Sequence, residues 1–368
     1  MFKDKRTVMV GTLVVALFLS LLTLLAPGKV LAAEYKSFIN IPNIPGESTD
    51  GAHPRWIDVI SWSFGETKPS TTVGATRATM QDLKFTMRTN AASPKLFLAG
   101  ARPERLQEAT LEVCRSDLQG NPRFLRIKIN DVIVSSFETL VNSGSTDLLE
   151  KVSLNFGKIE IAYTPFDTVS GAAGTTVTVG WDLRTNLGVG SLPTSPASIY
   201  PTRVGAGVVA AGKTLPGQTS PPAICFIKVG GFLGESTDRT HKDWIDVITS
   251  GFGETQPTTY SSGMPVQSNI QDFKFTMRTS KASPLLFLAG AMGQHIPEAM
   301  LEVYRPGVDT GDANLRITLS DVVISSFLSL GSTTSYPMEE ILLKFTKIKI
   351  QYTGPAGSTV EYQVSTTR

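Results

Sequence analysis

Two short segments of the sequence combine carboxylates with one histidine, the side chains that bind metal ions or transfer protons. The segments are residues 46–69 and 234–257, and 16 of their 24 positions are identical. The candidate residues are Glu47, Asp50, His53 and Asp58 in the first segment and Glu235, Asp238, His241 and Asp246 in the second. Carboxylates beside an imidazole could hold a hard or borderline cation or carry out acid–base chemistry.

The same residues also suit a polar turn, in which Ser, Thr and Asp side chains bond the local backbone. The spacing matches no established ligand motif, and each segment has a single histidine. The third histidine, His295, aligns with Arg105, and no GxSxG motif or Ser/His/Asp set occurs in both copies. We therefore expect a polar turn and predict no catalytic, cofactor-binding or metal-ligating residue. The chain is expected not to be an enzyme.

Trp56 and Trp244 each precede an I-D-V-I run. An exposed indole could stack on a sugar, but a tryptophan beside β-branched residues is more often part of a core, and we expect the core. The glycine cluster GGFLG at 230–234 has no helix after it, so it does not predict a phosphate site.

The repetition covers most of the chain. DLKFTMRTNAASPKLFLAGA at 82–101 returns at 272–291 as DFKFTMRTSKASPLLFLAGA, and FGKIEIAYT at 156–164 returns at 345–353 as FTKIKIQYT. The order is kept and the offset stays at 188–190, which indicates a tandem duplication of a whole domain. Module 1 is predicted at 34–186 and module 2 at 223–368. Residues 187–222, rich in Gly, Pro, Ser and Thr, are predicted to be a linker.

Within each module apolar and polar residues alternate. Ile159, Ile161 and Tyr163 fall on one face of a strand and Lys158 and Glu160 on the other, and residues 347–352 repeat this pattern. Strict alternation indicates antiparallel strands with one buried face. The predicted fold class is mainly β, with two tandem β-barrel modules of antiparallel strands.

One segment of each module predicts a short α-helix that flanks the barrel. In ASPKLFLAGA, Ser93 can cap the helix, Pro94 fits its first turn and Gly100 can end it. The second copy repeats these residues as Ser283, Pro284 and Gly290.

The first 33 residues resemble a secretory signal. A basic start (Lys3, Lys5 and Arg6) is followed by an apolar run over 8–26 and by small residues at 30–33. Cleavage is expected, and an uncleaved anchor is the alternative. The remaining chain is expected to be secreted or periplasmic, with no membrane association after signal cleavage.

Charge and cysteine usage limit the possible partners. The whole chain carries +2, residues 1–33 carry +3, and the remainder therefore carries about −1. No basic tract with interleaved aromatic residues occurs, so nucleic acid is not an expected partner. Cys114 aligns with Tyr304 and Cys225 with Ser37. The two cysteines could pair in an oxidising compartment or remain separate strand residues, and the sequence leaves both open.

The order of motifs resembles that of the haemolysin-coregulated proteins, the inner-tube components of bacterial type VI secretion. Module 1 shows FINIPNIPGESTDGAHPRWIDV, SPKLFLAG and QEATLEV, and module 2 shows FIKVGGFLGESTDRTHKDWIDV, SPLLFLAG and PEAMLEV. GWDLRTN at 180–186 is similar to the family's closing strand, whereas module 2 ends as VEYQVSTTR and lacks this motif.

The resemblance implies a barrel of two antiparallel sheets with one flanking helix, and six-membered rings that stack into a tube. Three chains of two modules would then form a pseudo-hexameric ring, so the expected partner is the chain itself, with secreted cargo or a surface partner as a further possibility. The predicted function is an exported structural protein that self-assembles into rings or tubes. The alternative is an exported non-catalytic binding protein that recognises a glycan, a peptide or a cell-surface partner.

Overall fold

The structure is a computed structural model that describes residues 35–68, 78–102, 104–116, 122–140, 148–167, 170–190, 224–255, 269–304, 313–333, 335–353 and 359–365. The predicted signal peptide and most of the predicted linker lie outside these residues. Within them strands predominate, and neither helix combines the length and the apolar character that a membrane crossing requires.

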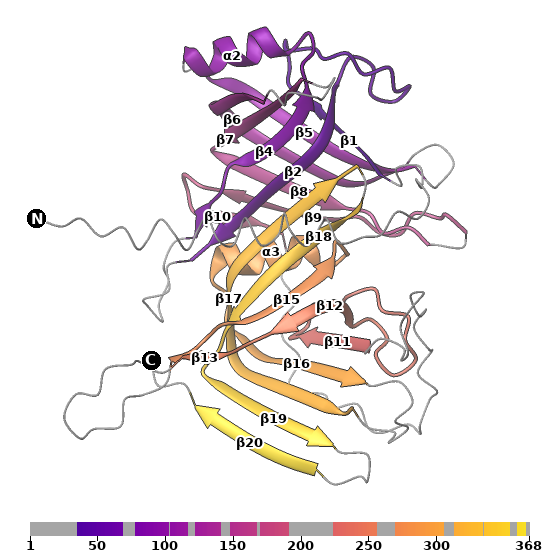
Figure 1. Ribbon diagram of the computed structural model, residues 1–368, viewed down its shortest axis with the longest axis vertical. Coiled ribbons are helices and arrows are strands. Elements are labelled where there is room, and N and C mark those ends of the chain that lie inside the picture. Colours follow the sequence, from indigo (N-terminus) through magenta and orange to yellow (C-terminus); the bar gives the residue numbers. More distant parts are fainter. Residues whose placement is uncertain are drawn as a thin grey trace, which may run out of the picture. The chain divides into compact units, whose positions relative to one another are not determined.

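The described part of module 1 consists of strands and one helix (Figure 1). Its elements are β1 (Tyr35–Asn40), β2 (Ile57–Thr67), β3 (Thr79–Met80), β4 (Leu83–Arg88), α2 (Ser93–Ala101), β5 (Leu106–Arg115), β6 (Arg123–Leu140), β7 (Leu149–Asn155), β8 (Lys158–Tyr163), β9 (Val177–Asp182) and β10 (Leu187–Val189). Antiparallel pairing runs β1–β5–β6–β7–β4–β2 and returns from β2 to β1, which closes a six-stranded barrel. Strands β8, β9 and β10 extend from β6. The predicted barrel is thus confirmed.

Module 2 repeats this arrangement. Its elements are β11 (Ile224–Val229), β12 (Ile245–Gly251), β13 (Glu254–Thr255), β14 (Asn269–Ile270), β15 (Phe273–Arg278), α3 (Ser283–Met292), β16 (Ile296–Tyr304), β17 (Leu315–Ser332), β18 (Ser335–Lys344), β19 (Lys347–Thr353) and β20 (Thr359–Ser365). The barrel closes as β11–β16–β17–β18–β15–β12–β11. Although module 2 lacks the GWDLRTN motif, β20 pairs with β19 as β9 pairs with β8.

A long strand in each module changes its pairing partners close to one bent residue. In β6 this residue is Asp131, with φ 54°, and in β17 it is Asp321, with φ 52°. The strand pairs with β8 up to Asn130 and with β5 up to Val132, and it pairs with β7 from Ile133 onward. Asp tolerates the left-handed region better than most residues, so the bend is encoded at the same place in both copies.

The helices confirm the predicted positions but not the predicted ends. Ser93 is not the cap: the N-cap is Ala92, without a side-chain hydrogen bond, and the Ser93 hydroxyl donates to Glu150 Oε2 at 2.6 Å. Ser283 donates in the same way to Glu339, at 2.5 Å. The glycines do not end the helices either, because α2 runs to Ala101 and α3 runs past Gly290 to Met292. Each serine hydroxyl therefore donates to a buried carboxylate instead of capping its helix.

The two barrels are joined by strand pairing. Residues 61–67 of β2 pair antiparallel with residues 326–332 of β17, which makes one continuous sheet from strands of both modules. The first residues of the segment predicted as a linker, Leu187–Val189, form β10 on the edge of β9. Both cysteines are free thiols, with Cys114 buried on β5 and Cys225 half-buried on β11.

Candidate functional site

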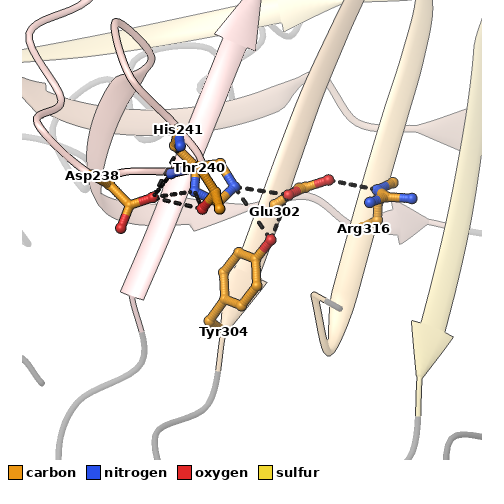
Figure 2. Close-up of polar contacts among 6 residues, drawn as sticks. All are labelled: Asp238, Thr240, His241, Glu302, Tyr304 and Arg316. Carbon is orange, nitrogen blue, oxygen red and sulfur yellow. Dashed lines mark hydrogen bonds and ion pairs between the residues drawn. The ribbon is translucent and has the colours of Figure 1, made fainter. Parts of the chain in front are cut away.

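A buried histidine lies between two carboxylates in module 2 (Figure 2). His241 Nδ1 is 2.8 Å from Asp238 Oδ1, and its Nε2 is 2.8 Å from Glu302 Oε2. Tyr304 donates its hydroxyl to Glu302 Oε2 at 2.7 Å, and Arg316 donates Nε–H to Glu302 Oε1 at 2.6 Å. The residues come from the 234–244 turn, β16 and β17, so the network fastens the turn to the barrel.

Module 1 carries a similar network with two changes, because its arginine comes from another position and a cysteine replaces the tyrosine. His53 bonds Asp50 Oδ1 at 2.9 Å and Glu112 Oε2 at 3.0 Å, and Arg123 pairs with Glu112. Where module 2 has a tyrosine hydroxyl, module 1 has the thiol of Cys114, 4.0 Å from His53 Nε2. In both modules the imidazole also stacks on a phenylalanine of the first strand, with ring centroids 4.2 Å apart.

The electrostatics of the network favour a charged histidine. Burial alone would lower the pKa of His53, but contacts with Cys114, Glu112 and Asp50 outweigh it and raise the pKa to about 10. Burial likewise opposes ionisation of Glu302, yet hydrogen bonds from His241 and its other partners lower its pKa to about 2. At neutral pH His53 is therefore an imidazolium held by two carboxylates.

This geometry suits a structural fastening and offers little for catalysis. Both ring nitrogens of each histidine face a carboxylate, so neither is available as a general base for a substrate. In the part of the chain that the structure describes, no group of three or more His, Cys, Asp or Glu residues is arranged to hold a metal ion.

The eight candidate residues do not form two clusters. Asp50 and His53, like their counterparts Asp238 and His241, belong to the networks. Glu47 instead accepts a hydrogen bond from the backbone of Ala91. Glu235 accepts one from the hydroxyl of Tyr163, and Asp58 and Asp246 are exposed. The sequence reasoning missed Glu112 and Glu302, although both copies place this acid in the L-E-V motif.

The two tryptophans lie beside the networks. Trp244 is buried, as predicted, whereas Trp56 is half-buried. Each meets the histidine of its own module edge to face, with centroids 4.9 Å apart. Neither is exposed as a platform for a sugar.

A second candidate site is the contact between the modules. We define the helix face of module 2 as α3 with residues 326–332 of β17. The sheet face of module 1 is β8, β9 and β10 with residues 61–67 of β2. The strand segments pair in register, and α3 lies against β2, β8, β9 and β10.

Three aromatic rings form the centre of this contact. Phe64 of the sheet face lies 5.9 Å from Phe287 and 6.2 Å from Phe327 of the helix face, centroid to centroid. Phe287 and Phe327 meet edge to face at 5.8 Å. All three are at most 3% exposed. Aromatic pairs add about 0.5–1.5 kcal/mol beyond the area that they bury.

A buried carboxylate lies beside these rings. Glu66 is 2% exposed, its Oε1 occupies the space that a Cβ of Gly290 would need, and its Oε2 has no hydrogen-bond partner among the described residues. Burial raises the pKa of Glu66 well above its ordinary value, and the neighbouring Lys68 only partly opposes this. Gly290 is thus small because a side chain of the other module enters the helix surface.

Polar and aromatic contacts complete the edge of the contact. Tyr163 OH donates to Glu235 Oε2 at 3.0 Å, and burial raises the pKa of that carboxyl. Tyr336 of module 2 meets Tyr35 edge to face at 4.9 Å and lies 5.8 Å from Phe124.

Each module also carries the counterpart of the face that the other module uses in this contact, and in the described residues these two counterparts are uncovered. The helix face of module 1 is α2 with residues 136–140 of β6, and the sheet face of module 2 is β19 and β20 with residues 249–255 of β12 and β13. Phe97 and Leu98 are 60% and 45% exposed, whereas their counterparts Phe287 and Leu288 are fully buried. Phe252, the counterpart of Phe64, is 41% exposed.

The sheet face of module 2 is apolar along its last strands. Its exposed large side chains are Tyr352, Val360, Tyr362 and Val364, at 41–70%. The counterpart of Tyr352 is Tyr163, which is 2% exposed under the contact between modules. An exposed apolar patch of this kind marks an interaction surface.

Comparisons with known proteins point to one family for both halves of the chain. The family model described as "Type VI secretion system effector, Hcp" matches residues 38–163 and 226–352. Protein hcp1 of Pseudomonas aeruginosa is 31% identical over 155 residues, which are 41% of this chain and 96% of that protein. A solved type six secretion system protein is 28% identical, covering 42% of this chain and 99% of its own, with a TM-score of 0.40. Hcp1 of Salmonella typhimurium is 26% identical with the same coverage and a TM-score of 0.36.

Proposed function

Because the chain belongs to the Hcp family of type VI secretion, which its two halves match one after the other, we propose that it is a structural protein that assembles head to tail with copies of itself. The helix face of module 1 in one chain covers the sheet face of module 2 in the next. Each contact between chains then repeats the contact that already exists between the modules. The observation that carries the proposal is that the helix face of module 1 and the sheet face of module 2, which are both uncovered in the described residues, are the counterparts of the two faces that contact each other between the modules.

The aromatic centre supports this repetition in detail. Phe97 and Phe137 already meet edge to face at 5.9 Å, as Phe287 and Phe327 do. The ring that would complete this pair is Phe252 of the next chain, which is exposed. Burying such rings contributes about 1.5–3 kcal/mol for each side chain that becomes fully covered.

The edges of two strands support it as well. In the described residues, 136–140 of β6 pair only with β7, and 249–251 of β12 pair only with β15. Their counterparts pair with each other across the modules. Shifting the observed register by the repeat offset sets Leu140 opposite Gly251. Open strand edges can pair with a strand of another chain.

Head-to-tail contacts are heterologous, so they form a closed ring when the rotation between units permits closure. We propose a ring of three chains, which places six modules around the axis as in the single-module relatives that the sequence resembles. We further propose that residues 1–33 direct export, so that assembly takes place outside the cytoplasm.

The test uses the mature chain and two substitutions that introduce the same residue. Phe97→Glu should weaken association at least about tenfold, because it sets a carboxylate in the aromatic centre. Gln107→Glu is the control, since Gln107 is exposed and its counterpart Pro297 stays exposed in the covered module. Phe252→Lys should partly restore association of the Phe97→Glu chain.

Native mass spectrometry and negative-stain microscopy provide the readout. Wild-type and Gln107→Glu chains should give trimers and rings, and Phe97→Glu should give single chains. A wild-type chain that stays monomeric at micromolar concentration, or equal association of all variants, would count against assembly and favour a binding protein that works as a single chain.

A further inference from the structure

One carboxyl group of module 1 lies within the contact between the modules. Glu66 of β2 is 2% exposed, and its Oε1 lies so close to Gly290 of α3 that a Cβ at that position would overlap it. Phe327 of β17 stands opposite Glu66 in the pairing register, and the Ser326 hydroxyl donates to the backbone carbonyl of Glu66 at 3.3 Å. The side chain therefore lies between its own strand and elements of module 2.

Module 2 brings no ionisable side chain to this carboxyl. Neither α3 nor residues 326–332 of β17 contain a charged or titratable residue, and β3, which pairs with β2 at Glu66, contains none either. Lys68 is half-buried, and it is the one charged group in the described residues whose attraction acts on Glu66. Among the same residues Glu66 Oε2 has no hydrogen-bond partner.

Ionisation of Glu66 works against the contact. A carboxylate that is removed from water without hydrogen bonds is far less favourable than its neutral, protonated form. Burial accordingly raises the pKa of Glu66 well above the ordinary 4.5, and the attraction of Lys68 opposes this only in part. When the modules part, the carboxyl returns to water and to its ordinary pKa.

We propose that Glu66 makes the contact between the modules sensitive to pH: the protonated carboxyl allows the contact to close fully, and its ionisation loosens it. The stabilisation is complete below pH 4.5 and is lost as the pH rises toward the value at which Glu66 ionises inside the contact. One proton for each contact weakens the closed state by up to about tenfold per pH unit over that range. The pH therefore sets how firmly the two modules are joined, whether or not chains assemble.

Hydrogen exchange on dilute, monomeric full-length protein measures this contact through two backbone amides. Lys68 N donates to Ser325 O at 2.9 Å, and Thr333 N donates to Ile60 O at 3.0 Å. Each of these contact amides is held by an acceptor of the other module, so its protection reports the joined state. Protection is compared after correction for the intrinsic effect of pH on exchange.

Two other amides report the barrels themselves. Gly157 N donates to Asn130 O within module 1, and Gly230 N donates to Glu298 O within module 2, both at 2.9 Å. These barrel amides should keep their protection under conditions in which the contact amides lose theirs, because the modules part before either barrel opens.

Two variants remove the ionisation, and a third is the control. Glu66→Gln and Glu66→Met keep the length of the side chain but cannot ionise. Between pH 5 and 7 the contact amides of the wild type should lose at least about tenfold more protection than those of either variant. At pH 7 both variants should be at least as well protected as the wild type, because they resemble the protonated form. Glu108→Gln, which removes a carboxylate that pairs with Lys128 on module 1, should follow the wild type.

Other buried carboxyls titrate in all four proteins alike. Burial also raises the pKa of Glu235 at the edge of the contact and that of Glu339 beside α3. The difference between the wild type and the Glu66 variants removes their contributions, so the comparison isolates Glu66.

The proposal would be overturned by the same pH dependence in the wild type and both Glu66 variants. Lower protection of both variants than of the wild type at pH 7 would also overturn it, because an ion pair between Glu66 and Lys68 would then hold the modules together. Loss of protection at the barrel amides in step with the contact amides would count against it equally. None of these outcomes depends on whether rings form, so the proposed assembly stands or falls separately.

Discussion

Gly100 of α2 provides the sharpest test of the assembly because its substitution should move two measurements in opposite directions. Within the chain the three atoms nearest to a Cβ at Gly100 all belong to Val134, with Cγ1 at 3.3 Å. Its counterpart Gly290 leaves room for the carboxylate of Glu66 from the other module. If chains associate through the same faces, Gly100 lies against the next chain as Gly290 lies against module 1, and the counterpart of Glu66 in the sequence, position 254, is again glutamate.

The expected magnitudes follow from these contacts. Glycine costs about 0.8–1 kcal/mol relative to alanine in a helix interior and less in a last turn. Gly100→Ala should therefore leave the stability of the single chain unchanged or raise it by up to about 1 kcal/mol. At the contact between chains the added methyl group overpacks a filled site, which costs about 1–3 kcal/mol, or about 5- to 150-fold in the dissociation constant.

Two assays on the same preparations give the answer. Urea unfolding below the association concentration measures the free energy of the single chain, and sedimentation velocity over a concentration series measures association. Gly290→Ala is the matched control, because it should destabilise the chain itself by about 1–3 kcal/mol. Unchanged association of Gly100→Ala would refute the reasoning, as would a Gly290→Ala chain as stable as wild type.

Three further predictions concern buried polar groups. The folded pKa of His53 is about 10 against 6.5 unfolded, so its contribution is complete below pH 6.5 and is lost as the pH rises through 10. His53→Gln should therefore cost about 2–4 kcal/mol at pH 7 in urea unfolding and approach wild type above pH 10. The folded pKa of Glu339 is about 8 against 4.5 unfolded, because burial penalises its charge. The free energy of unfolding of the wild type should therefore fall by up to about 1.4 kcal/mol per pH unit between pH 4.5 and 8, and that of Glu339→Gln should not. Tyr163→Phe should destabilise the single chain by about 1–2 kcal/mol because it removes a hydrogen bond from the buried Glu235, whereas Tyr352→Phe, its counterpart, should change only association, as sedimentation would show.

Repetition and alternation were sufficient to predict the barrels. A constant offset identifies two copies of one domain, and the period-two pattern at Lys158–Tyr163 predicts the buried face that the structure shows. These features follow from local chemistry, because a strand with one wet face shows it in its own sequence.

Features that depend on distant residues could not be predicted in this way. Ser93 has the right type and place for a cap, but a carboxylate 57 residues away in sequence takes its hydroxyl. Glu112 completes the histidine network only because β5 lies beside the turn in space. From the sequence alone Gly290 resembles a helix end, because the sequence does not show that the Glu66 side chain of module 1 occupies the space beside it.

In the proposed assembly, duplication favours the contact within the chain over the contact between chains. The contact within the chain gains from the covalent connection, which raises the effective concentration of its partner face. It also gains β10, whose Gly188 and Gly190 lie against Leu288 of α3. In the described residues β20, the counterpart of β9, pairs only with β19, so no strand like β10 supports the contact between chains. The chain should therefore keep its two modules together at dilutions where assemblies separate, and the smaller contact sets the concentration at which assembly begins.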